Sequence, residues 1–248
     1  APDNEILFTT ATCGEPICHV VIPEKILARG QVGGMKSFLN VIEENKIYPA
    51  FDEKRQPYVQ IDWVGAWTAA AGATIYDGGA WPAKWAATER YSFFMSEATR
   101  QLFHHEFLDP KGATYQGRKE DGRKQTEFLA STDYWFRPIH SRVGPDGAIY
   151  VVDLYNQIAV HNDTRGPGHG ARNAAARPDR DHHFTRIWRI QHKDAKTLPT
   201  AKFDRNDADT LVAALNHPNG WVRSTANRLL IEQPALLESA LESLGQLI

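Results

Sequence analysis

Short apolar runs, bounded by glycine and proline, fill most of the first 195 residues of the chain. The runs EILFTTATC and ICHVVIP are rich in β-branched residues, which is typical of strands. Residues 91–117 predict a strand, a polar break, a second strand and a turn. Phe38, Val41 and Ile42 have helical spacing, so we expect a short helix to interrupt the strands there.

The clearest hairpin of the sequence follows the arginine-proline pair at 137–138. The sequence GPDG at 144–147 supplies turn chemistry, and residues 148–154 alternate between apolar and polar as a strand does. The run FTRIWRIQH then predicts a further strand of the same unit.

From Asp207 the apolar positions change to a helical period. The sequence HPNG at 217–220 predicts a joint between two helices, and Pro234 predicts the start of another. Amphipathic helices joined by short turns are typical of an α-solenoid.

Repeated four-stranded units of about 40 to 50 residues are typical of a β-propeller. We therefore expect a mainly β fold with an α tail: a partial β-propeller of about three blades over residues 1–195, then a HEAT-like α-helical repeat over 207–248. About three blades cannot close a ring, and open strand edges favour association. We expect missing blades or another chain as a partner, and the chain to be a fragment of a longer protein.

Charge and hydropathy exclude two classes of partner. The formal net charge of −2 gives no general basic surface, so we expect no nucleic-acid binding. No apolar run approaches the roughly 18 residues of a membrane-spanning helix, so we expect no transmembrane segment.

The motifs after Phe136 occur in a specific order. FRPIHSRVGPDGAIYVVDLYN followed by RPDRDHHFTRIWRI resembles the last propeller blade of the family of membrane-bound dehydrogenase-like, haem-binding propeller proteins, which are related to soluble glucose/sorbosone dehydrogenases. LVAALNHPNGWVRSTANRLL resembles the HEAT-like repeat that follows the propeller in that family. Many relatives carry a further histidine near position 184, where this chain has Phe184.

The resemblance implies a periplasmic or secreted, cell-envelope protein. It implies oxidation of a carbohydrate-like alcohol with a quinone such as pyrroloquinoline quinone, aided by calcium, with electrons passing to a cytochrome c domain or partner. The alternative is a non-catalytic propeller and HEAT module that binds glycans or proteins in the envelope. A third hypothesis is hydrolysis by a metal-activated water. It requires three convergent metal ligands and an open coordination position, and it ranks last.

The polar stretch HNDTRGPGHGARNAAARPDRDHHF at 161–184 carries most of the candidate chemistry. Long connections between propeller strands gather at one face of the ring, where ligands bind. The candidate catalytic bases are His161 and His182. The candidate cofactor-binding residues are Arg165, Arg172, Arg180, Tyr155 and Asn156. The candidate metal ligands are Asp153, Asp163, Asp181, His169 and His183.

Each of these candidates has a structural alternative. The arginines and aspartates of the polar stretch can pair with one another and make a long loop rigid. The sequence DLYN at 153–156 can equally be a strand-end turn held by Asn156.

Cys13, Cys18 and His19 form the pattern C-x4-C-H. In an oxidising compartment a hairpin disulfide between Cys13 and Cys18 is the first expectation, two free thiols the second, and covalent haem the third, because haem attachment usually has C-x-x-C-H. His104 and His105 are adjacent on a predicted strand and face opposite sides, so we expect structural roles for both.

Overall fold

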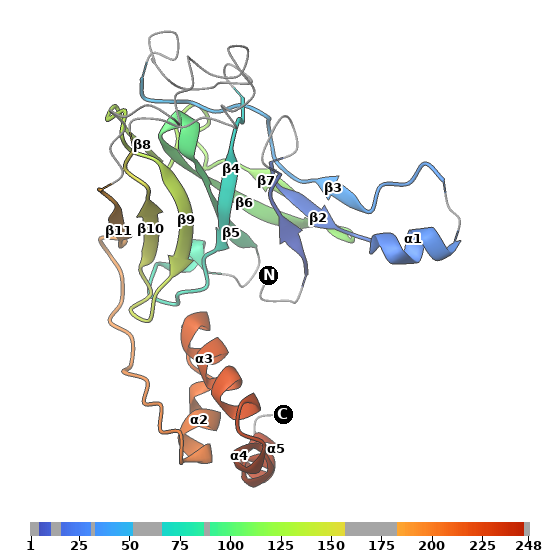
Figure 1. Ribbon diagram of the computed structural model, residues 1–248, viewed down its shortest axis with the longest axis vertical. Coiled ribbons are helices and arrows are strands. Elements are labelled where there is room, and N and C mark those ends of the chain that lie inside the picture. The colour runs from blue at the N-terminus through green and yellow to red at the C-terminus, as the bar shows by residue number, and fades with distance from the viewer. Residues whose placement is uncertain are drawn as a thin grey trace.

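The computed structural model describes residues 5–10, 16–30, 33–51, 66–86, 90–156 and 183–245. Within these ranges the chain is mainly β, with three antiparallel sheets and a group of helices near its C-terminus (Figure 1). The mainly β character with an α tail is confirmed. None of the helices in the described ranges is long and apolar enough to cross a membrane.

The first sheet is small and has the order β1-β2-β3. Its strands are β1 (Leu7–Phe8), β2 (Cys18–Val20) and β3 (Phe38–Asn40). The helix predicted around Phe38 is wrong, because this segment pairs antiparallel with β2 and Phe38 lies opposite Val20. A helix, α1, does interrupt the strands, but it spans Glu24–Gly30.

The second sheet is the largest, and its main path is the meander β4-β5-β6-β7. Its elements are β4 (Ala70–Ile75), η2 (Ala83–Trp85), β5 (Tyr91–Glu97), η3 (Ala98–Arg100), β6 (Leu102–Lys111), β7 (Thr114–Arg118) and β8 (Leu129–Ala130), of which β8 pairs with β6. The predicted strand, polar break and strand over 91–117 are confirmed, and η3 forms the break.

The third sheet has the order β11-β10-β9. Its strands are β9 (Pro138–Val143), β10 (Ile149–Asp153) and β11 (Arg186–Ile190). The predicted hairpin is confirmed: β9 and β10 flank the turn, and Gly147 has a φ of 74°, which favours glycine.

The three sheets share two apolar cores. On one face of the central sheet, Phe93, Met95 and Leu108 pack with Ile17 and Val41 from the region of the first sheet. The opposite face contributes to the second core, in which Phe94, Phe103 and Phe107 pack with Val143, Ile149 and Val151 of the third sheet. Because side chains alternate along β5 and β6, the central sheet lies between the other two.

Four helices form a separate group that lies beyond one end of the sheets (Figure 1). They are α2 (Ala208–Ala214), α3 (Gly220–Ile231), α4 (Pro234–Ser239) and α5 (Leu241–Gly245). Asp207 caps α2 and Asn219 caps α3, since their side chains accept backbone N–H groups of the first turn. The helical starts predicted at Asp207, HPNG and Pro234 are confirmed.

Candidate functional site

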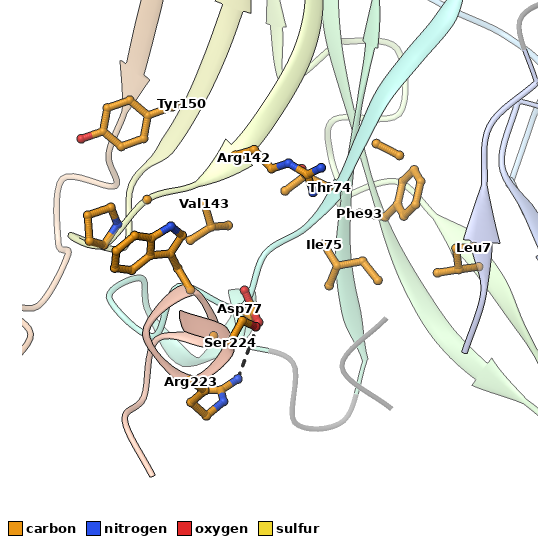
Figure 2. Close-up of a pocket in the computed structure, with 15 residues that line it drawn as sticks. Leu7, Thr74, Ile75, Asp77, Phe93, Arg142, Val143, Tyr150, Arg223 and Ser224 are labelled. Carbon is orange, nitrogen blue, oxygen red and sulfur yellow. Dashed lines mark ion pairs between the residues drawn. The ribbon is translucent and has the colours of Figure 1, made fainter. Parts of the chain in front are cut away.

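A groove of about 1070 Å3 opens between the sheets and the start of α3 (Figure 2). The first strand of each sheet contributes to its wall: Leu7 from β1, Ile75 from β4 and Val143 from β9. Trp221 and Ser224, in the first turns of α3, line it from the helical side. Its volume lies just above the range of roughly 300–1,000 Å3 that small-molecule sites occupy.

Strands β4 and β9 form a fixed wall because their backbones approach closely. Thr74 Oγ1 donates a hydrogen bond to the Ser141 carbonyl at 2.7 Å, and Ser141 Oγ donates to the Gly72 carbonyl at 2.9 Å. A Cβ at Gly72 would lie 2.4 Å from His140 Cα, and Gly72 has a φ of 60°. Only glycine allows this approach.

The start of α3 is attached to both loops that border the groove. The buried Asn219 side chain donates from Nδ2 to the carbonyls of Gly144 and Pro145, at 2.8 and 3.1 Å. Gly220 N donates to the Asp77 carbonyl at 2.9 Å, and a Cβ at Gly220 would overlap the Asp77 carboxylate. The helix therefore has a defined position relative to the sheets.

Charged side chains enter the groove from β9, from α3 and from the loop after β4 (Figure 2). Arg223 of α3 pairs with Asp77 at 3.6 Å. Burial raises the pKa of Asp77, and the Arg223 guanidinium opposes this rise. Arg142 of β9 is exposed and makes no ion pair among the described residues. The groove thus combines the Asp77–Arg223 ion pair with a further cation, Arg142.

Comparison with family models gives a match to the Domain of unknown function (DUF7133) over residues 2–194. The chain belongs to the DUF7133 family. Neither the comparison with curated proteins nor that with solved structures gave a match. The matched range contains the three sheets and ends before α2, so the DUF7133 region supplies the strand wall of the groove and later residues supply Trp221, Arg223 and Ser224.

Most of the candidates in the polar stretch lie outside the described residues of this DUF7133 chain. They are His161, His182, Arg165, Arg172, Arg180, Asp163, Asp181 and His169. His183 is described and exposed. Within the described ranges no group of three or more His, Cys, Asp or Glu side chains could hold a metal ion. The proposed metal and cofactor roles therefore stay predictions.

The strand end DLYN in the DUF7133 region is a compact hydrogen-bonded turn. The buried Asp153 accepts from the backbone N–H of Arg137 and of Tyr155 on Oδ1, and from Arg186 Nε and Trp188 Nε1 on Oδ2, all within 2.8–3.0 Å. The Arg186 guanidinium also lies 3.4 Å from the Tyr155 ring centre. Asp153 is thus surrounded by donors and holds the turn, which agrees with a structural role for this strand end.

Asn156 is buried, and its carbonyl accepts from Arg137 Nε at 3.1 Å. Its position next to the turn gives it a structural contact in the described region.

The cysteine motif of the DUF7133 region is described in part. Cys18 is buried in β2, whereas Cys13 lies outside the described residues, so the disulfide stays a prediction. His19 uses both ring nitrogens: Nε2 lies 2.9 Å from Glu5 Oε2, and Nδ1 lies 3.0 Å from Thr114 Oγ1.

A buried polar network surrounds His104 of the central sheet in the DUF7133 region. His104 lies between two carboxylates, with Nδ1 2.6 Å from Glu127 Oε2 and Nε2 3.2 Å from Glu106 Oε1. Lys119 Nζ lies 3.4 Å from the other Glu127 oxygen. Burial lowers the pKa of His104, but the charges of Glu127 and Glu106 outweigh it and raise the value to about 9. His104 is therefore a cation at neutral pH.

The neighbouring His105 faces the second core, as predicted from strand alternation. Its ring lies within 5 Å of the ring centres of Trp85, Phe94 and Phe107. Burial and the charge of His104 hold the pKa of His105 well below its usual value. On opposite faces of the sheet, His104 is therefore protonated at neutral pH and His105 is neutral. Sequence reasoning missed the network because Lys119 and Glu127, which complete it, are distant along the chain from His104 and Glu106.

Proposed function

We propose that this chain is part of an envelope oxidoreductase of the propeller type, in which the groove binds a carbohydrate-like alcohol. The observation that carries the proposal is the convergence of β1, β4 and β9 on one groove. In a propeller the sheets pack face to face around a central channel, and ligands bind at its mouth. The order of the sheets around two shared cores supports three neighbouring blades.

The lining suits a ligand with hydroxyl groups. Trp221 and Tyr150 offer aromatic surface, and Ser224, Asp77 and Arg142 offer polar groups. Small-molecule sites typically combine apolar and aromatic walls with a few placed polar groups. A sugar presents both a C–H face and hydroxyls, so it matches this combination.

The described residues fit the implied cofactors only in part. A quinone would supply the hydride acceptor, and Arg142 could bind one of its carboxylates. Calcium needs six to eight oxygen ligands. Asp77 is the only carboxylate of the described lining, and Arg223 occupies it. These residues do not fit calcium.

A second candidate function is a non-catalytic module that binds glycans in the envelope. One observation favours it: the described lining contains no histidine, and its single carboxylate is paired. The described part of the groove therefore supplies binding groups without a free base.

The two functions differ in what the purified full-length protein oxidises. We would record its absorption spectrum and metal content, add pyrroloquinoline quinone and calcium, and follow reduction of an artificial electron acceptor over a panel of sugars. A quinone or haem band together with sugar-dependent reduction supports the oxidoreductase. A protein that binds sugars but carries no cofactor, binds no added quinone and reduces no acceptor is the glycan-binding module instead.

A further inference from the structure

The described lining of the groove has an excess of positive charge. Its described titratable lining consists of Asp77, Arg142, Arg223 and the phenol Tyr150. Asp77 and Arg223 compensate each other as an ion pair at 3.6 Å. The Arg142 guanidinium is left as the uncompensated charge.

The carboxylates near Arg142 are engaged elsewhere. Asp146, in the turn after β9, accepts from Arg189 Nε at 2.7 Å and from the Tyr150 hydroxyl at 3.1 Å. Asp77 is taken by Arg223. No ion pair of Arg142 occurs in the described part of the chain, although the two other arginines nearby both have one.

The position of Arg142 is set by its strand and not by a flexible loop. It lies opposite Tyr150 in the β9–β10 ladder, and the next residue along β9, Val143, is buried in the second core. Strand β9 is itself fixed to β4 by the hydrogen bonds of Ser141. Figure 2 shows Arg142 extending from β9 toward Thr74 of the neighbouring strand β4. The strand thus fixes the backbone of Arg142 at the groove, and its exposed guanidinium can bind a carboxylate through two parallel hydrogen bonds.

We propose that Arg142 makes the groove select sugars that carry a carboxylate, such as hexuronates, over neutral sugars. The aromatic and hydroxyl-bearing lining would hold the ring, and Arg142 would hold the acidic group. This inference rests on the proposed sugar-binding function and names the substrate class of that site.

The test compares three ligands of the same ring size on the full chain: glucuronate, its uncharged methyl ester, and glucose. We would measure their affinities by isothermal titration calorimetry at low and at high salt. Glucuronate is expected to bind about tenfold or more tightly than the ester, because its carboxylate gains charge-assisted hydrogen bonds. High salt should weaken glucuronate binding and leave the two neutral ligands nearly unchanged.

Variants assign the preference to one residue. Arg142→Gln should bring the affinity for glucuronate down to that for the ester, with both neutral ligands unaffected. Arg142→Lys should keep part of the preference, because lysine is a point charge without the two-pronged geometry. The control is Arg123→Gln, which removes an arginine that is 61% exposed and pairs with Glu120 away from the groove.

Each outcome bears on a different claim. Equal binding of glucuronate and its ester, or a preference that survives Arg142→Gln, overturns the inference, whereas sugar binding as such still supports the proposed function. If none of the three ligands binds the full chain, both the inference and the proposed sugar-binding function are refuted.

Discussion

The buried histidine between two carboxylates makes the stability of the protein depend on pH in a defined way. His104 is 1% exposed and contacts Glu127 and Glu106 through its two ring nitrogens. The perturbation we consider is His104→Gln, which keeps a polar side chain of similar size and removes the positive charge. The substitution leaves the buried carboxylates of Glu106 and Glu127 with less positive charge beside them.

The magnitude follows from the difference between the folded and unfolded pKa values of His104. The folded value is about 9 and the ordinary value 6.5, and each unit corresponds to about 1.4 kcal/mol, so the protonated imidazole contributes about 3 kcal/mol. Because the folded pKa is raised, this contribution is fully present below pH 6.5. It is lost as the pH rises through about 9.

The assay is urea unfolding of the protein and of His104→Gln at intervals from pH 6 to pH 10. At pH 6 the variant should be less stable by about 3–5 kcal/mol, the usual cost of removing one partner of a buried ion pair. The difference should shrink by about 3 kcal/mol by pH 10, because the wild-type histidine is then neutral. His192→Gln is the control, since His192 is partly exposed and its one ion pair among the described residues is with Asp194, at 3.9 Å.

A difference that stays constant between pH 6 and pH 10 would refute the reasoning, because it would mean that His104 does not change its charge in this range. A difference that grows with pH would mean that the imidazole is neutral in the folded protein. Either result would remove the ion-pair description of the network.

Three further perturbations test the contacts around the groove and the turn. Gly72→Ala should separate β4 from β9 and lower the melting temperature by several degrees, whereas Gly112→Ala, with nearly the same φ and open space around it, should cost only backbone strain. Arg186→Ala should cost about 3 kcal/mol or more in chemical denaturation by removing the ion pair of the buried Asp153, and Arg189→Ala at the surface under 1 kcal/mol. Asn219→Ala removes two hydrogen bonds to the turn and a helix cap, and we expect faster proteolysis of the helical tail together with a loss of about 2 kcal/mol.

Elements whose signals are local could be predicted from the sequence. The hairpin at 144–147 depends on turn residues, and the helices after Asp207 depend on capping residues and apolar spacing, all within a few positions. The segment at Phe38 shows the limit of this reasoning. Three apolar residues with helical spacing there are overridden by pairing with β2, which no local pattern reports.

The groove could not be predicted because its polar groups come from three distant segments. Asp77 follows β4, Arg142 lies on β9 and Arg223 lies on α3, and only the packing of sheets and helix brings them together. The polar strand end DLYN made Asp153 a candidate metal ligand. A sequence pattern does not distinguish a carboxylate that binds a ligand from one that accepts hydrogen bonds from its own protein. The four donors around Asp153 make that distinction.

Because α3 is attached to the sheets through its first residues, a small tilt at that end gives a larger displacement at its other end. Asn219 and Gly220 fix one end to the two loops of the sheets, and the next turn lines the groove. A helix of 12 residues is about 18 Å long. A tilt of about 10° at the attached end would therefore displace the far end by about 3 Å. A ligand that shifts Trp221 or Arg223 slightly would move the helices packed against Leu229 and Leu230 by a larger, measurable amount.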